Sequence, residues 1–75
     1  MTQVTAALAS WDGVNKVFGA SVATCPDGAK VTGGGYDKAS GVDVLYNGPF
    51  GPNAWRVYGF SHSAGVVTAF ALCVQ

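Results

Sequence analysis

Hydrophobic positions in this chain recur with a period of two over short segments, which is typical of β-strands. The longest segment is residues 66–74, where one side reads Val66, Thr68, Phe70, Leu72, Val74 and the other reads Val67, Ala69, Ala71, Cys73. Because both sides are apolar, we predict that both are buried. We also expect the side of small residues to lie against the glycine-rich segment, residues 33–35.

Other segments show the same period or the composition of strands. Residues 14–24 are rich in strand-forming types, with Gly19 as an expected bulge or corner, and residues 29–37, 42–46 and 55–60 follow. Turn residues separate these segments at a spacing of about ten residues. The chain therefore predicts an all-β single domain over residues 1–75, a small antiparallel sandwich or barrel of five to six short strands.

The N-terminal segment, residues 1–13, has three interpretations. If residues 1–9 are extended, Val4, Ala6 and Leu8 share one side, which fits an edge strand or a free arm. The run Ala6 to Ala9 also favours a helix. A turn at Trp11-Asp12-Gly13 ends the segment in any case.

The stretch from Cys25 to Tyr36 combines a turn with a strand that lacks side chains. Pro26-Asp27-Gly28 has the residue types of a tight turn, because proline fixes one turn position and the other two residues tolerate the left-handed region. Three glycines then follow at residues 33–35. A strand without side chains lets another backbone or a bulky ring approach closely.

Composition indicates that other protein covers part of the surface. Of the 75 residues, 49% are hydrophobic and only 11% are charged, with no net charge. A domain of this size buries only about 60% of the surface of its unfolded chain. The neutral balance argues against nucleic acid, which requires a basic surface, and against an anionic membrane surface.

The two cysteines, with no Cys-x-x-Cys, favour a disulfide over a metal or redox site, and so an oxidising final location. Residues 1–10 lack the basic and apolar regions of a secretion signal, and no segment is long enough to span a bilayer. Three explanations remain open: a signal has been removed, the thiols stay reduced, or the protein is made in bacterial cytoplasm and released by lysis.

The residue types do not predict an enzyme, a cofactor or a metal site. The one histidine, His62, lies in an expected turn without a nucleophile motif around it. Three of the four aspartates, Asp12, Asp27 and Asp37, fit turns and strand ends, and the eleven glycines form no phosphate-binding pattern. Only three Cys and His residues exist, and they lie far apart in sequence, which does not suit zinc.

Aromatic side chains are more numerous than so small a core requires. We expect Trp55, Phe70 and either Tyr58 or Phe60 in the core. Phe50 stands on the Pro-Gly loop of residues 47–53, where it either inserts into a partner or folds back, and Trp11 has the same two interpretations. The candidate assembly contacts are Trp11, Tyr46, Phe50, Val4 and Leu8.

Part of the chain resembles a known small β domain. The residues are Cys25-Pro26-x-Gly28-x-Lys30-Val31-x-Gly33-Gly34-Gly35-Tyr36, then Pro49 or Pro52, Trp55-x-Val57, and Thr68-Ala69-Phe70-Ala71-x-Cys73. This pattern is similar to that of domains in actinobacterial secreted proteins, at the ends of collagen-like chains, and in proteins of actinobacterial viruses. The resemblance implies an all-β fold, a Cys25–Cys73 disulfide and no enzymatic activity.

Two functions follow as hypotheses. The first is a structural protein of a bacterial virus on the virion surface, such as a capsid decoration or minor capsid protein. It would contact itself and a major capsid protein, and trimers would suit the local threefold axes of a capsid. The second is a secreted actinobacterial module that binds carbohydrate or surfaces through exposed Trp11, Tyr46 or Trp55.

Overall fold

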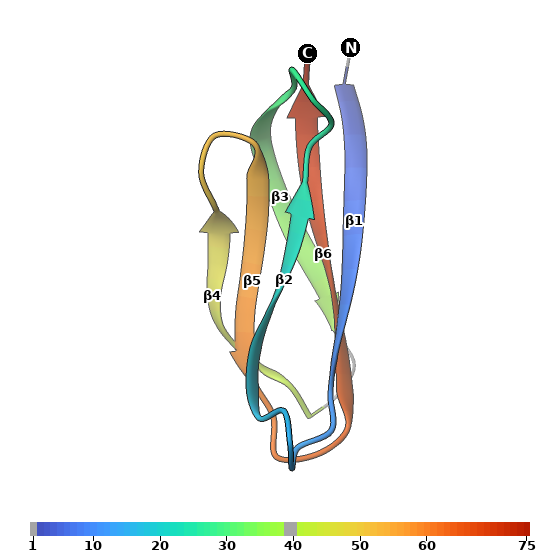
Figure 1. Ribbon diagram of the computed structural model, residues 1–75, viewed down its shortest axis with the longest axis vertical. Helices are drawn as coiled ribbons and strands as arrows, with labels where there is room; N and C mark the ends of the chain where they lie inside the picture. Colours follow the sequence, from blue (N-terminus) through green and yellow to red (C-terminus); the bar gives the residue numbers. More distant parts are fainter. Residues whose placement is uncertain (1, 39–40) are drawn as a thin grey trace.

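The computed structural model describes residues 2–38 and 41–75 as a two-layer β fold (Figure 1). Its antiparallel strands are β1 (Thr2–Trp11), β2 (Phe18–Thr24), β3 (Lys30–Lys38), β4 (Asp43–Pro49), β5 (Ala54–Phe60) and β6 (Gly65–Val74). They form two three-stranded sheets, with the orders β1-β6-β3 and β2-β5-β4. The predicted all-β sandwich is therefore confirmed. The described residues contain no helix that could cross a membrane.

The N-terminal segment is an edge strand rather than a helix. β1 pairs with β6 in an unbroken register that runs from Thr2 opposite Val74 to Trp11 opposite Gly65. Both chain ends therefore lie at the same end of the molecule (Figure 1). The hydroxyl of Ser21 in β2 donates a hydrogen bond of 2.6 Å to the carbonyl oxygen of Ala7, so this edge of β1 is tied to the other sheet.

The strand pairing is interrupted at two places, neither of which is Gly19, where a bulge or corner was expected. Gly19 is opposite Gly59 in a regular ladder, so the predicted bulge at Gly19 is wrong. The pairing shifts instead between Val31 and Gly33 in β3, and between Val44 and Tyr46 in β4. The predicted turn at residues 26–28 is present, because the Ala29 N–H donates to the Pro26 carbonyl at 3.0 Å and Gly28 adopts a φ of 84°.

The core is built from small side chains. The inward side of β6 carries Val67, Ala69, Ala71 and Cys73, all buried, and they pack with Trp11, Ala23, Cys25, Ala29, Val42 and Val57. The expected core aromatics Tyr58, Phe60 and Phe70 are instead only partly buried. Small inward residues suit two sheets that approach closely, because long side chains would hold the layers apart.

The prediction that both sides of β6 are buried is wrong. Its outward residues Val66, Leu72 and Val74 are between 36% and 41% exposed. In a two-layer antiparallel sandwich each sheet buries only one side. The glycine-rich β3 lies beside β6 in the same sheet, so the side of small residues points into the core rather than onto β3.

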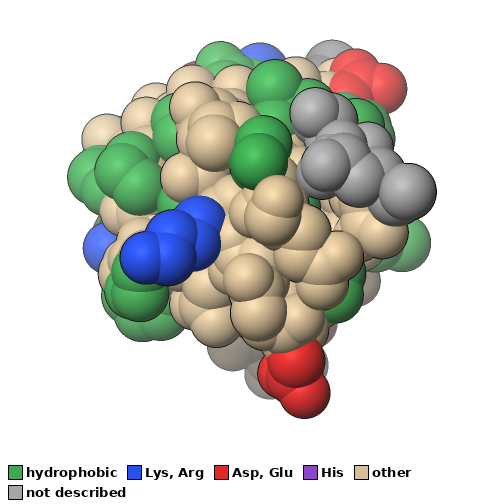
Figure 2. All heavy atoms as spheres, turned by 90° about the horizontal axis from the view of Figure 1, so that it is seen from above, with side chains coloured by type: hydrophobic (Ala, Val, Ile, Leu, Met, Phe, Trp, Pro, Cys, Tyr) green, Lys and Arg blue, Asp and Glu red, His purple; other side chains and the backbone are tan. Residues whose placement is uncertain are grey.

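Hydrophobic side chains consequently occupy much of the surface. Seen from the end that carries the termini, they lie on several sides of the molecule with few charged groups between them (Figure 2). Large hydrophobic residues with more than half of their surface exposed are Val14, Leu8, Val4, Phe18 and Leu45. They come from β1, from the connection that follows it, and from β2 and β4, so both sheets contribute to the apolar surface.

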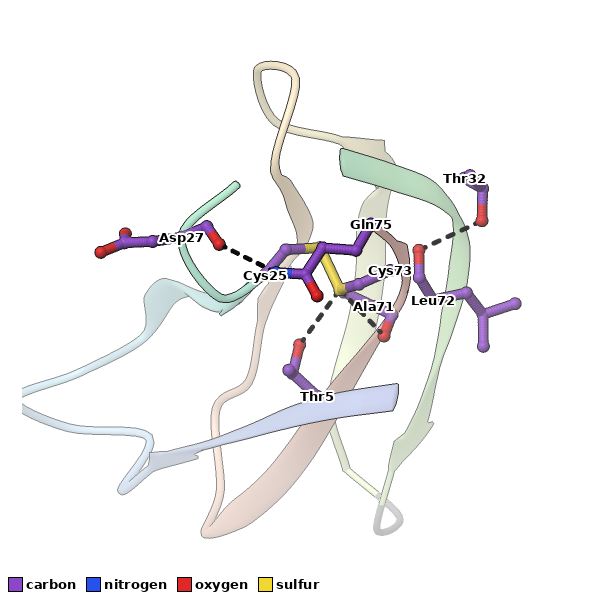
Figure 3. The surroundings of a disulfide bond; sticks show 8 residues. All are labelled: Thr5, Cys25, Asp27, Thr32, Ala71, Leu72, Cys73 and Gln75. Atoms are coloured by element: carbon purple, nitrogen blue, oxygen red, sulfur yellow. Dashed lines mark hydrogen bonds between the residues drawn. A yellow bond between two sulfur atoms is a disulfide. The ribbon is translucent and has the colours of Figure 1, made fainter. Parts of the chain in front are cut away.

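A disulfide joins the two sheets. Cys25, which follows β2, is bonded to Cys73 in β6 at an S–S distance of 2.09 Å (Figure 3). Both cysteines are buried. At the same end, the side chain of Gln75 donates to the carbonyl of Asp27 at 3.3 Å.

Candidate functional site

The potential metal ligands of the described residues are dispersed over the molecule. No group of three or more Cys, His or Asp side chains that could hold a metal ion is found in the described ranges. His62 is exposed, and its ring contacts the ring of Phe60 edge-on at 5.7 Å between centroids. The notable surfaces are instead the outer faces of the two sheets.

The outer face of the β1-β6-β3 sheet is aliphatic. Residues directly opposite one another in a ladder point to the same side, so Val4 lies beside Leu72 and Ala6 beside Phe70. In Figure 3 the side chain of Leu72 points away from the disulfide, whereas the sulfur of Cys73 lies between the sheets. We call this surface the aliphatic face; it comprises Val4, Ala6, Leu8, Val66, Phe70, Leu72 and Val74.

One edge of the aliphatic face is a strip without side chains. Gly33 lies opposite Leu72 and Gly35 opposite Phe70. A Cβ atom at Gly35 would have nothing within 4 Å. The face thus has a ridge of side chains on β1 and β6 and a shallow strip on β3. The charged residues of β3 on this side are Lys30, opposite Val74, and Asp37, opposite Thr68.

The outer face of the β2-β5-β4 sheet is aromatic. The ring of Phe18 lies 5.6 Å from that of Phe60 and 6.5 Å from that of Tyr58 between centroids. The guanidinium of Arg56 lies 5.0 Å from the ring of Tyr46 and 4.7 Å from that of Phe50. We call this surface the aromatic face; it comprises Phe18, Tyr46, Phe50, Arg56, Tyr58 and Phe60.

Four of the five predicted contact residues lie on these two faces. Val4 and Leu8, with exposed fractions of 61% and 70%, belong to the aliphatic face, and Tyr46 and Phe50 belong to the aromatic face. The ring of Phe50 is half exposed and half folded back onto Arg56. Phe50 therefore folds back in part onto its own domain, and half of its surface stays accessible.

Trp11 is not a surface contact. Only 3% of Trp11 is exposed, because it closes one end of the core, and the Lys16 ammonium lies 4.8 Å from its ring centroid. Trp55 is partly buried and its Nε1 donates to Asn47 at 2.7 Å. Of the three rings expected to bind carbohydrate, Trp11 is thus buried, and Trp55 is partly buried with its N–H in a hydrogen bond.

The sequence reasoning missed Val66, Leu72 and Val74 as surface residues. The sequence held a signal for their exposure, since the side chains on the two sides of residues 66–74 differ in size. The larger side was expected inside with the smaller one, whereas only the smaller side fits between the sheets.

Comparison with known proteins adds no relative. No protein-family model, curated protein or solved structure matches this chain.

Proposed function

We propose that this chain is a non-enzymatic structural protein whose exposed apolar faces are covered by other protein. The observation that carries the proposal is the aliphatic face, where the large side chains of β6 point outward while its smaller side chains, Val67, Ala69, Ala71 and Cys73, point into the core. Contiguous exposed apolar surface of this kind marks interaction sites in soluble proteins.

The proposed setting is the surface of a virion, where the chain acts as a capsid decoration or minor capsid protein. A short chain with two broad apolar faces can contact a copy of itself through one face and a shell subunit through the other. Each such contact adds buried apolar area, at about 25 cal/mol per Å². A disulfide-linked sandwich would hold both faces in fixed relative positions. Support comes from these faces, the low charge and the resemblance over the residues quoted from Cys25 to Cys73.

Mass spectrometry of purified virions tests this setting. The virions are those of the virus whose genome encodes the chain, and we expect the protein among their structural components. Deleting the gene should lower the temperature at which the shell releases its DNA. Absence of the chain from virions would refute the virion setting.

Incorporation of variants tests the surface. Leu72→Lys places a charge in the aliphatic face, and we expect it to reduce incorporation strongly. Val14→Lys is the matched control, since Val14 is 81% exposed in the β1–β2 connection outside both faces. Equal incorporation of the two folded variants would show that the aliphatic face is not covered.

A further inference from the structure

We infer that the aliphatic face pairs with the same face of a second copy around a two-fold axis parallel to the strands. In this pair β1 of each copy lies over the glycine strip of β3 of the other. The inference rests on the proposed function in requiring that the aliphatic face be covered by protein. It adds the identity of the partner, the symmetry and the residues in contact.

The shape of the face supports this arrangement. An axis that runs along β6 exchanges β1 with β3 and preserves the position of each residue along the strands. Val4 and Gly33 both lie in the row of Leu72, so Val4 would sit over the partner's Gly33. Ala6 and Gly35 both lie in the row of Phe70 and would meet in the same way. The β1 side chains of each copy thus cover the glycine strip of the other, while β6 faces β6, so that Leu72 and Phe70 meet their own counterparts.

A two-fold axis perpendicular to the strands gives poorer packing. It would place β3 over β3, with Lys30 of each copy near Asp37 of the other, because these residues lie at opposite ends of the strand. The two glycine strips would then face each other with no side chain between them. Exposed ion pairs contribute little, whereas an unfilled strip loses contacts along its whole length. Packing therefore favours the parallel axis.

The distribution of charge selects the aliphatic face for self-pairing. Its charged residues, Lys30 and Asp37, are of opposite sign and lie on the edge strand β3; Asp37 shares the row of Thr68 with Leu8, so it would meet the partner's Leu8 at the edge of the pair rather than at the axis. On the aromatic face, Arg56 lies on the central strand β5. Two copies paired through that face would bring two guanidinium groups together near the axis, where removal from water makes like charges costly.

The area of the face indicates a weak, reversible dimer. Three strands about 4.8 Å apart, in a molecule 40 Å long, give a face on the order of 500 Å² per copy. A pair would bury about 1,000 Å² in total, the lower limit for a specific interface. We therefore expect the dimer to dissociate at micromolar concentrations.

Sedimentation velocity over a concentration series tests the pairing with Gly35→Val. A Cβ at Gly35 meets open space and its φ is not positive, so valine should leave the monomer folded. Valine would occupy the strip that the partner's β1 needs, and we expect the dimer dissociation constant to rise about tenfold or more. In the perpendicular arrangement valine would fill a gap and tighten the dimer, which would overturn the proposed axis.

Two further variants separate this inference from the proposed function. Leu72→Lys should abolish the dimer, and Leu45→Lys, on an exposed residue of the other sheet, should leave it unchanged. A wild-type chain that forms trimers, or stays monomeric at millimolar concentration, would overturn the two-fold pair. Virion incorporation that still depends on Leu72 would then leave the proposed function standing.

Discussion

The indole of Trp55 in β5 lies directly against Gly34 in β3, across the interface between the two sheets. A Cβ atom at Gly34 would stand 2.5 Å from both Cγ and Cδ2 of Trp55, and it would also collide with the carbonyl oxygen of Phe70. The expectation that the glycine segment admits a bulky ring is confirmed at this position. The missing side chain at Gly34 thus leaves room for the indole of Trp55.

Gly34→Ala should destabilise the fold. The methyl group cannot enter without displacing the indole or the β6 backbone, and overpacking of this kind costs about 1–3 kcal/mol. Urea denaturation of the monomer would measure the loss. Gly35→Ala is the matched control, because its Cβ meets nothing within 4 Å and alanine restricts the unfolded chain. Equal stabilities of the two variants would contradict the contact.

The disulfide should contribute much of the stability of so small a core. Cys25 and Cys73 are 48 residues apart in sequence, and in the chain-entropy model closing such a loop contributes roughly 4 kcal/mol. The double variant Cys25→Ala, Cys73→Ala should therefore show a much lower midpoint of unfolding. Thiol titration of the denatured wild type should detect no free thiol without reductant. Two free thiols would contradict the bond.

The fold was largely predictable from the sequence because the period of two and the turn residues act locally. The segments at residues 55–60 and 66–74 match β5 and β6 to within one residue. Local pattern also located the turn at Pro26-Asp27-Gly28. The bulges at β3 and β4 were not predicted, since they depend on how a partner strand aligns rather than on the bulged strand alone.

The orientation of the faces was not predictable in the same way. Alternation shows that Phe70 and Leu72 share a side, but it does not show which side faces the core. The usual preference places the larger residues inside. Here Trp11 and Trp55 occupy the core or its border, which leaves only small side chains room on the inner side of β6. Trp11 follows the usual preference: of its two interpretations, the one in which the ring folds back onto its own domain fits an exposed fraction of 3%.

Ser21→Ala should loosen the junction between the two sheets. Ser21 is 2% exposed, and its hydroxyl bonds the Ala7 carbonyl at 2.6 Å. Its loss leaves that carbonyl without this donor, at a cost of about 1–2 kcal/mol. Urea denaturation measures the change, with the exposed Ser10→Ala as control. A loss no larger than that of Ser10→Ala would show that the hydrogen bond contributes little.

Asp12, in the turn between β1 and β2, should stabilise the fold at neutral pH but not in acid. Its Oδ1 accepts hydrogen bonds from the backbone N–H groups of Val14, Asn15 and Lys16, each at 2.8 Å. These bonds, that of Lys16 foremost, lower the pKa of the Asp12 carboxyl. The folded pKa therefore lies below that of the unfolded chain, which is about 3.9. The stabilisation is present above that pH and is lost as the pH falls through the folded pKa.

Thermal unfolding of the wild type and of Asp12→Asn, from pH 7 to pH 2, would measure the stabilisation contributed by the Asp12 charge. Asparagine retains an acceptor oxygen but cannot titrate, so the wild type should be more stable above about pH 5 and the difference should shrink below about pH 4. The two proteins differ only at residue 12, so the contributions of all other groups cancel in the comparison. A difference that persists unchanged at pH 2 would show that the charge of Asp12 does not stabilise the turn.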